Sequence, residues 1–330
     1  MADLPAQPDP LSPEAQAILD APPYPRQSGS ATAEEVRAAR AAESAARAPV
    51  IAELARRLDV VATERLAGGV RVVDVRSAVP AGDGTAAATP EQGMDLPHAP
   101  EPAAHAHFLH GGGWIGGVAN DMTSVLMADR LRIPVLSVDY SLLPDAPFPV
   151  AIEESLTAYR ALTAELGGPW VIFGVSAGGN MAVSLTHRIR QEGLPAPVAL
   201  GLFTPATDLT GQGDSRLAND GRDPVLLHRD DLLAGEALYA GDAPLDDPLV
   251  SPIYADYDAS FPPTMLTTGT RDAFLSDCTR LYWRLRRAGV RTELRVWENL
   301  WHAFNTQPHL PEAAEARDEM ADFLLAALAA

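Results

Sequence analysis

Lysine is absent from this 330-residue sequence, and all 25 of its basic residues are arginines. This absence excludes reactions that need a lysine of this chain, namely Schiff-base formation with pyridoxal phosphate, phosphate binding in P-loop NTPases and Ser–Lys hydrolysis. Cysteine occurs once, at Cys278, so the chain cannot form an internal disulfide. We interpret Cys278 as a packed residue at the start of a helix, because nothing around it indicates a reactive thiol.

Long apolar runs and an excess of positive charge are missing as well. No stretch of about 18 apolar residues occurs, and residues 1–25 contain seven prolines but no apolar segment typical of a signal peptide or membrane anchor. The 44 acidic residues give a formal charge of −19, which disfavours binding to nucleic acids, anionic membranes and strongly anionic substrates. We therefore predict a soluble, cytoplasmic protein without a nucleic-acid or membrane partner.

From residue 105 onward, short apolar runs alternate with helical periodicities. This pattern is typical of an α/β fold in which helices flank a mostly parallel central sheet. We expect strands at residues 70–75, 105–109, 133–139, 170–174, 198–203, 264–268 and 292–297. We expect helices at residues 177–191, 277–288 and 312–328, and a further one whose apolar face is marked by Ile152, Leu156 and Tyr159.

Two segments do not follow this alternation. Residues 33–59 predict two helices, the second beginning near Pro49, which form either a solvent-facing pair on the core or a lid over a pocket. Residues 205–250 are rich in Asp and Gly and contain an apolar helical piece near residues 226–239. This second segment has the character of an insertion between two strands of the sheet.

Residues 174–178, with the sequence Gly-Val-Ser-Ala-Gly, form a G-x-S-x-G motif between a predicted strand and a predicted helix. In this context the motif is typical of a nucleophile elbow, in which Ser176 occupies a strained turn and its hydroxyl projects from the sheet. The flanking glycines permit a turn in which larger side chains would clash. The alternative is a glycine-rich turn without chemistry, and the strand and helix on either side favour the elbow.

Residues 110–114, with the sequence His-Gly-Gly-Gly-Trp, directly follow another predicted strand. Three consecutive glycines expose backbone N–H groups, which acyl transfer uses to stabilise the charge on the oxygen of a tetrahedral intermediate. The spacing of His105, His107 and His110 also suggests a metal cluster. The additional aspartate and the later ligands of a metallohydrolase are missing, so we predict no metal site.

A serine nucleophile needs a base and a carboxylate that orients the base, and in this fold the chain order is Ser, then Asp or Glu, then His. His302 follows the last predicted strand, at the sheet edge where catalytic loops gather. Asp272 follows the strand at 264–268 and is favoured over Asp277, which we interpret as the N-cap of the next helix. The weaker candidates for the base are His187, His228 and His309.

Four sequence blocks together resemble the hormone-sensitive-lipase-like branch of the α/β-hydrolases, which includes bacterial carboxylesterases and members known as acetyl or lactone hydrolases. The blocks are residues 110–114, 139–149, 174–182, and 269–272 together with 301–304, and the resemblance extends over about residues 105–328. Four positions carry residues that the family does not usually have. Val175 replaces an acidic residue or threonine, Ser141 and Asp145 replace Arg and Glu, and Ala303 replaces glycine.

The resemblance implies an α/β-hydrolase fold with a catalytic triad and an oxyanion hole beneath a helical cap. The triad would be Ser176, Asp272 and His302, and the oxyanion hole would be formed by the N–H groups of Gly112, Gly113 and Ala177. Residues 1–65 would form the N-terminal part of the cap, and residues 66–330 the catalytic domain, with a cap insertion at about 205–250.

These observations predict a serine carboxylesterase that hydrolyses short-to-medium acyl esters, needs no cofactor or metal, and is compatible with a homodimer. A lactone hydrolase or an amidase would use the same groups, whereas the intact Ser176 and His302 disfavour a non-catalytic ligand receptor. Four aromatic residues are expected to line or border an apolar pocket, with ordinary core packing as the alternative for each. They are Trp114, Phe148, Trp301 and Phe304.

Overall fold

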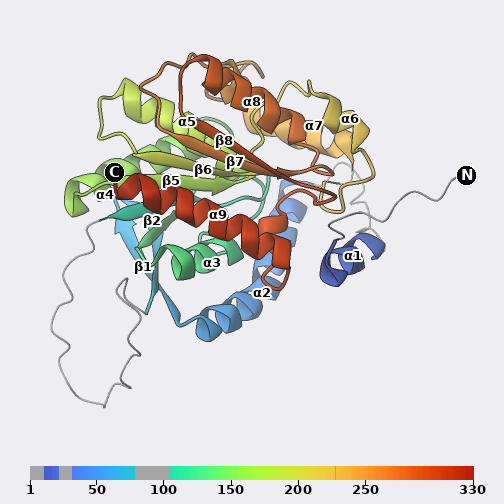
Figure 1. Ribbon diagram of the computed structural model, residues 1–330, viewed down its shortest axis with the longest axis horizontal. Helices are drawn as coiled ribbons and strands as arrows, with labels where there is room; N and C mark the ends of the chain where they lie inside the picture. Colours follow the sequence, from blue (N-terminus) through green and yellow to red (C-terminus); the bar gives the residue numbers. More distant parts are fainter. Residues whose placement is uncertain (1–10, 22–31, 79–103, 227) are drawn as a thin grey trace, which may run out of the picture.

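The computed structural model describes residues 11–21, 32–78, 104–226 and 228–330, which form one eight-stranded sheet with helices on both faces (Figure 1). The strands are β1 (Val60–Ala67), β2 (Val70–Ser77), β3 (His105–Leu109), β4 (Val135–Val138), β5 (Trp170–Val175), β6 (Ala199–Phe203), β7 (Thr264–Gly269) and β8 (Thr292–Trp297). Their order is β1-β2-β4-β3-β5-β6-β7-β8; β1–β2 and β2–β4 pair antiparallel, and the other pairs are parallel. The predicted fold class and all seven predicted strands are confirmed.

Helices cover the two faces of the sheet in separate layers. The helices of the described residues are α1 (Pro13–Asp20), α2 (Ala33–Arg57), α3 (Met122–Leu131), α4 (Val150–Leu166), α5 (Ala177–Gln191), α6 (Asp214–Ala218), α7 (Arg229–Ala240), α8 (Leu275–Arg287) and α9 (Pro311–Leu328), with short 3₁₀ turns η1 (Pro252–Tyr254) and η2 (Phe304–Thr306). Helices α3 and α9 pack on one face, and α4, α5 and α8 pack on the other (Figure 1). No helix in the described ranges is long and apolar enough to span a bilayer.

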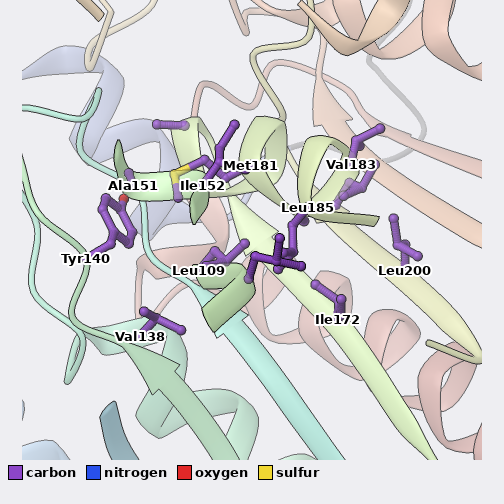
Figure 2. Close-up of a cluster of buried hydrophobic side chains, with 14 of the residues drawn as sticks. Leu109, Val138, Tyr140, Ala151, Ile152, Ile172, Met181, Val183, Leu185 and Leu200 are labelled. Carbon is purple, nitrogen blue, oxygen red and sulfur yellow. The ribbon is translucent and has the colours of Figure 1, made fainter. Parts of the chain in front are cut away.

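The core on each face is built by alternate residues of the strands. In β5, Ile172 belongs to the layer under α4 and α5, while Val171 and Phe173 belong to the layer under α3 and α9. Figure 2 shows the first layer, where Leu185 of α5 packs over Ile172. Because full burial of such a side chain contributes about 1.5–3 kcal/mol, these layers hold the carboxyl ends of the parallel strands in a fixed frame.

Several predicted details are wrong at the N-terminal side. Residues 33–57 form one helix rather than two, because α2 starts at a capping box made by Thr32 and Glu35 and continues through Pro49. The sheet begins at Val60, before the boundary expected at residue 65, since β1 is an edge strand with mostly exposed side chains and so lacks an apolar pattern. Residues 1–10 and 22–31 of the expected cap segment lie outside the described residues.

Candidate active site

Ser176 occupies the turn between β5 and α5. Its backbone has φ 57° and ψ −120°, a conformation that costs a non-glycine residue about 1–3 kcal/mol. The turn is held from both sides, because the Ser176 N–H donates to the Phe203 carbonyl (2.9 Å) and the Ser176 carbonyl accepts from the N–H of Asn180 (3.1 Å). These two hydrogen bonds hold the strained turn, which places the Ser176 hydroxyl at the carboxyl end of the sheet.

Both glycines of the G-x-S-x-G motif are required by close backbone contacts. A Cβ atom on Gly174 would lie 2.2 Å from the carbonyl oxygen of Gly178. A Cβ atom on Gly178 would lie 2.0 Å from the carbonyl oxygen of Leu109. The motif thus reflects the steric demands of the elbow, and its second glycine lets the end of β3 approach the serine turn.

A continuous chain of hydrogen bonds joins the serine, the histidine and an aspartate. His302 Nε2 lies 2.8 Å from Ser176 Oγ, and His302 Nδ1 lies 3.1 Å from Asp272 Oδ1. The second carboxylate oxygen of Asp272 accepts a hydrogen bond from Thr268 Oγ1 (2.7 Å), and the Phe274 ring packs edge-on against the imidazole. All three members are buried. With Nδ1–H donating to the carboxylate, Nε2 is free to accept the serine proton.

Asp277 has a different position from the one predicted. Helix α8 begins at Leu275 after Phe274, so Asp277 lies inside the first turn rather than at the N-cap. Its buried carboxylate accepts hydrogen bonds from the N–H groups of Thr207 (2.9 Å) and Asp208 (3.0 Å) and pairs with Arg216. The prediction was wrong because these partners come from a distant segment, which local capping rules do not consider.

The glycine-rich loop at residues 110–114 lies against the elbow. The Cβ position of Gly111 is 3.1 Å from the Val175 carbonyl oxygen and 3.4 Å from Ser176 Cβ, and Gly112 has a φ of 116°. Tyr140 fixes the start of this loop, since its hydroxyl donates to the His110 carbonyl (2.7 Å) and its ring stacks on the imidazole. The start of the glycine-rich loop therefore lies beside the serine turn.

Three other histidines, His105, His107 and His187, have aromatic surroundings instead. His105 stacks on Trp170, and His107 meets Tyr159 edge-on; burial lowers the pKa of His107 to about 3, so it is neutral at pH 7. His187 packs with Tyr257 and Phe261, away from the serine. In the part of the chain that the structure describes, no three His, Cys, Asp or Glu side chains lie close enough to hold a metal. His228 precedes α7, Cys278 is buried, and His309 lines a separate groove.

That groove, about 330 Å³ in volume, contains none of the three hydrogen-bonded residues. It is lined by Pro49, Val50, Glu53, Leu54, Arg57, Met122, Pro308 and His309.

The four aromatic residues expected around a pocket separate into two groups. Trp114 stacks on Tyr239 of α7 at 3.9 Å, and Phe148 meets the same ring edge-on. Trp301 and Phe304 are fully buried in a core cluster with residues of α1 and α9, so their contacts are core packing.

The structure shows the local surroundings of three of the four positions that differ from the resembled family. Ala303 has a φ of 55°, the left-handed conformation that the usual glycine adopts easily. Asp145 pairs with Arg37 of α2, and Ser141 donates to Glu154 of α4. Asp223 also belongs to this region, because its carboxylate accepts a hydrogen bond from the N–H of His302 (3.1 Å). It was not predicted, since no motif or strand end marks it in the sequence.

Comparison with known proteins identifies the family of this fold. A family model described as the alpha/beta hydrolase fold matches residues 106–306. An esterase of Acinetobacter venetianus is 32% identical over 65% of this chain and 72% of its own length, and the putative acetyl-hydrolase LipR of Mycobacterium tuberculosis is 31% identical over 72% and 76%. Among solved structures, esterase E25 has a TM-score of 0.83 at 29% identity, covering 99% of this chain and 98% of its own. A hormone-sensitive lipase from a metagenome library has a TM-score of 0.77 at 26% identity, covering 96% and 97%. The chain therefore belongs to the α/β-hydrolase fold family, among its hormone-sensitive-lipase-like carboxylesterases.

Proposed function

We propose that this protein is a serine carboxylesterase that acts through an acyl-enzyme, with Ser176 as nucleophile, His302 as base and Asp272 as the group that orients the base. The observation that carries the proposal is the buried hydrogen-bond chain, 2.8 Å from Ser176 to His302 and 3.1 Å from His302 to Asp272, on a strained elbow. Such a chain activates a serine hydroxyl, which is a weak nucleophile at its ordinary pKa.

The reaction follows from these roles in two stages. His302 Nε2 accepts the hydroxyl proton while Ser176 Oγ attacks the ester carbonyl carbon, and the N–H groups of Gly112, Gly113 and Ala177 stabilise the resulting oxyanion. The protonated imidazole then donates to the leaving alcohol. Water, deprotonated by the same imidazole, releases the acid and restores the serine.

The aromatic group made by Trp114, Phe148 and Tyr239 supports a small acyl pocket. Tyr239 contacts both of the other rings, and Trp114 belongs to the glycine-rich loop beside Ser176. Added methylenes gain burial only until such a pocket is full, so short-to-medium acyl chains are preferred. Lactones and amides would use the same groups and differ only in the leaving group.

The experiment is a series of p-nitrophenyl esters from acetyl to palmitoyl, with a lactone and an anilide, assayed on the wild type, Ser176→Ala and the control Ser184→Ala. Loss of the nucleophile costs on the order of 10⁴–10⁶ in kcat, whereas Ser184 lies further along the same helix and its replacement leaves the rate near wild type. A fluorophosphonate label attaches only where Ser176 is present. Retention of more than a tenth of the rate by Ser176→Ala contradicts the triad, and a maximum at palmitoyl contradicts the small pocket.

The first half of α2 and the insertion at about 205–250 are proposed to form the cap. Arg37 pairs with Asp145, Arg40 donates to the Leu143 carbonyl (2.8 Å), and the carboxylate of Glu43 lies 3.6 Å from the Cβ position of Gly116, just after the glycine-rich loop. These contacts between α2 and the loops at Gly116 and at Leu143 and Asp145 support the proposal that the helix belongs to the cap.

Deletion of residues 1–48 tests this cap, because Pro49 is a natural first residue for the remaining helix and the buried anchors Ile51 and Leu54 are kept. We expect a folded protein whose activity falls most for the more hydrophobic esters, since the pocket loses its cover. Thermal unfolding of the truncated chain is the control for folding. Undiminished turnover by a folded truncated chain contradicts the proposal.

A further inference from the structure

Asp223 lies in the insertion between α6 and α7, and its carboxylate is fully buried. Oδ1 accepts hydrogen bonds from the N–H groups of Val225 (2.9 Å) and Leu226 (3.1 Å). Oδ2 accepts from the N–H groups of His302 (3.1 Å) and Ala273 (3.3 Å). One side chain thus joins a turn of the insertion to the two loops that carry the base and its carboxylate partner.

The two loops have other links to each other, but these lie nearer the ends of the strands. The Arg271 N–H donates to the Leu300 carbonyl (2.9 Å), and the Asn299 N–H donates to Thr270 Oγ1 (2.7 Å). Beyond these bonds, His302 is joined to the loop after β7 in two ways: its side chain bonds to Asp272, and its backbone N–H shares the Asp223 carboxylate with the Ala273 N–H. The backbone position of the base is therefore set by an acceptor from the insertion.

The insertion does not need Asp223 for its attachment. It is anchored to α8 by the buried Asp277, which holds the N–H groups of Thr207 and Asp208, and by Arg216, which pairs with Asp277 and Glu236. Asn219 adds donor contacts to the carbonyls of Thr270 and Asp272. Asp223 differs from these groups because it bonds to the histidine residue itself.

The charge on Asp223 also faces the reacting groups. The titratable side chains around the imidazole are Ser176 from the elbow, Asp272 from the loop after β7 and Asp223 from the insertion, while the Arg216 guanidinium lies behind the Phe274 ring. Burial raises the pKa of Asp223, and attraction to a protonated His302 opposes this shift. Four N–H donors favour the carboxylate form of Asp223, and in that form its negative charge attracts the protonated imidazole.

We propose that Asp223 is a positioning residue for ester hydrolysis: its carboxylate fixes the backbone of His302 relative to Asp272, so that the insertion sets the geometry of the base as well as covering the site. This role rests on the proposed function, because it acts on the same triad. A small misplacement of a catalytic group can reduce turnover by about 100-fold. The effect therefore belongs to kcat rather than to substrate binding.

The test compares Asp223→Asn, Asp223→Glu and the control Asp277→Asn in the full chain. Asn keeps one acceptor oxygen and turns an N–H₂ group toward backbone donors, while Glu keeps the charge but moves it by one methylene. Asp277→Asn removes a carboxylate of similar burial that holds the insertion and does not touch His302. The measurements are kcat, KM and the pH profile for p-nitrophenyl acetate, the rate of fluorophosphonate labelling, and thermal unfolding.

For Asp223→Asn we expect kcat and the labelling rate to fall about 10- to 100-fold with KM within twofold. The acid limb of its kcat profile moves to lower pH, because the imidazolium loses a neighbouring negative charge. Asp223→Glu lowers kcat without moving the limb, and it carries the kcat test if the Asn variant does not fold. Asp277→Asn lowers the unfolding temperature with kcat within about twofold.

Two results would overturn the inference. One is a wild-type kcat and acid limb in the folded Asp223 variants. The other is a kcat loss in Asp277→Asn equal to that in Asp223→Asn, which would make both residues mere anchors of the insertion. Labelling of wild type at Ser176 separates these outcomes from a failure of the proposed function, because a wild-type protein that is not labelled refutes both together.

Discussion

The sheet core and the contacts that anchor the insertion at residues 205–250 are both buried, but their chemistry differs. The core consists of apolar side chains that alternate along the strands, as Ile172 and Phe173 do in β5. The insertion adds some apolar residues to this core, such as Leu209 and Tyr239, but charged groups cross-link it. The buried Arg216 bonds to both carboxylate oxygens of Glu236 and to Asp277, and the partly exposed Arg280 pairs with the buried Asp208. The two regions meet at the loops after β7 and β8.

This difference has consequences for tolerance to change. Apolar cores accept many substitutions of similar volume, because dispersion and burial are not directional. A buried ion has a desolvation cost of several kcal/mol, and it is offset only when its partners are in place. Each ion pair of the insertion becomes unfavourable when one of its partners is removed, so these contacts hold the insertion in one arrangement. In that arrangement Asp223 bonds to His302.

The largest expected effect is a loss of kcat, and it distinguishes Asp272 from Asp277. Asp272→Asn removes the anion that orients His302 and leaves the wrong tautomer favoured, so we expect kcat to fall about 10⁴-fold while the unfolding temperature changes little. Asp277→Asn should do the opposite, with a loss of about 1–3 kcal/mol in the free energy of unfolding, because Arg216 and two backbone donors lose a charged acceptor. Ester hydrolysis and urea unfolding measure the pair, and the reverse ranking would give the catalytic role to Asp277.

The next largest effect concerns the cation of the insertion. Burial lowers the pKa of Arg216, but the charges of Asp277 and Glu236 outweigh burial and the net shift is upward, so the side chain stays charged. Arg216→Met leaves two buried carboxylates without their partner, and we expect a loss of about 3–5 kcal/mol in the free energy of unfolding. Arg280→Met is the matched control, since its ion pair is partly exposed and weaker. The free energies of unfolding are measured in urea at pH 8. If Arg216→Met and Arg280→Met lose equal amounts, burial does not determine how much these ion pairs contribute to stability.

Much of the catalytic region was predictable because its residues obey local rules. Ser176 is marked by two glycines whose Cβ atoms would collide with carbonyl oxygens, and His302 and Asp272 follow the ends of recognisable strands. Sterics and strand order thus leave a signal in the sequence. The helical piece of the insertion was also predictable from its apolar residues and appears as α7.

The contacts between the insertion and the sheet were not predictable in the same way. Asp223 meets His302 across 79 residues of chain, and Asp277 meets Thr207 across 70. Neither pair follows a periodicity, a cap or a motif, because each depends on how a loop folds back in space. Strand β1 and the continuity of α2 were missed for a related reason, since an edge strand and a helix that contains proline both contradict local preferences.

The smallest effect is a pH dependence confined to the insertion. Burial raises the pKa of Glu236 to about 7, against attraction from Arg216 that lowers it. A carboxyl group whose pKa is higher in the folded state binds more protons when folded, so its contribution to stability is present at low pH and is lost as the pH rises toward 7. The wild type should therefore lose roughly 2 kcal/mol more than Glu236→Gln between about pH 5 and 8, since Gln cannot ionise. Urea unfolding at several pH values gives the difference, and Glu319→Gln, at an exposed pair with Arg295 outside the insertion, is the control expected to follow the wild-type slope. A slope for Glu236→Gln that matches the wild type would mean that Arg216 keeps Glu236 ionised throughout this range, and that the charged contacts of the insertion are as indifferent to pH as the apolar core.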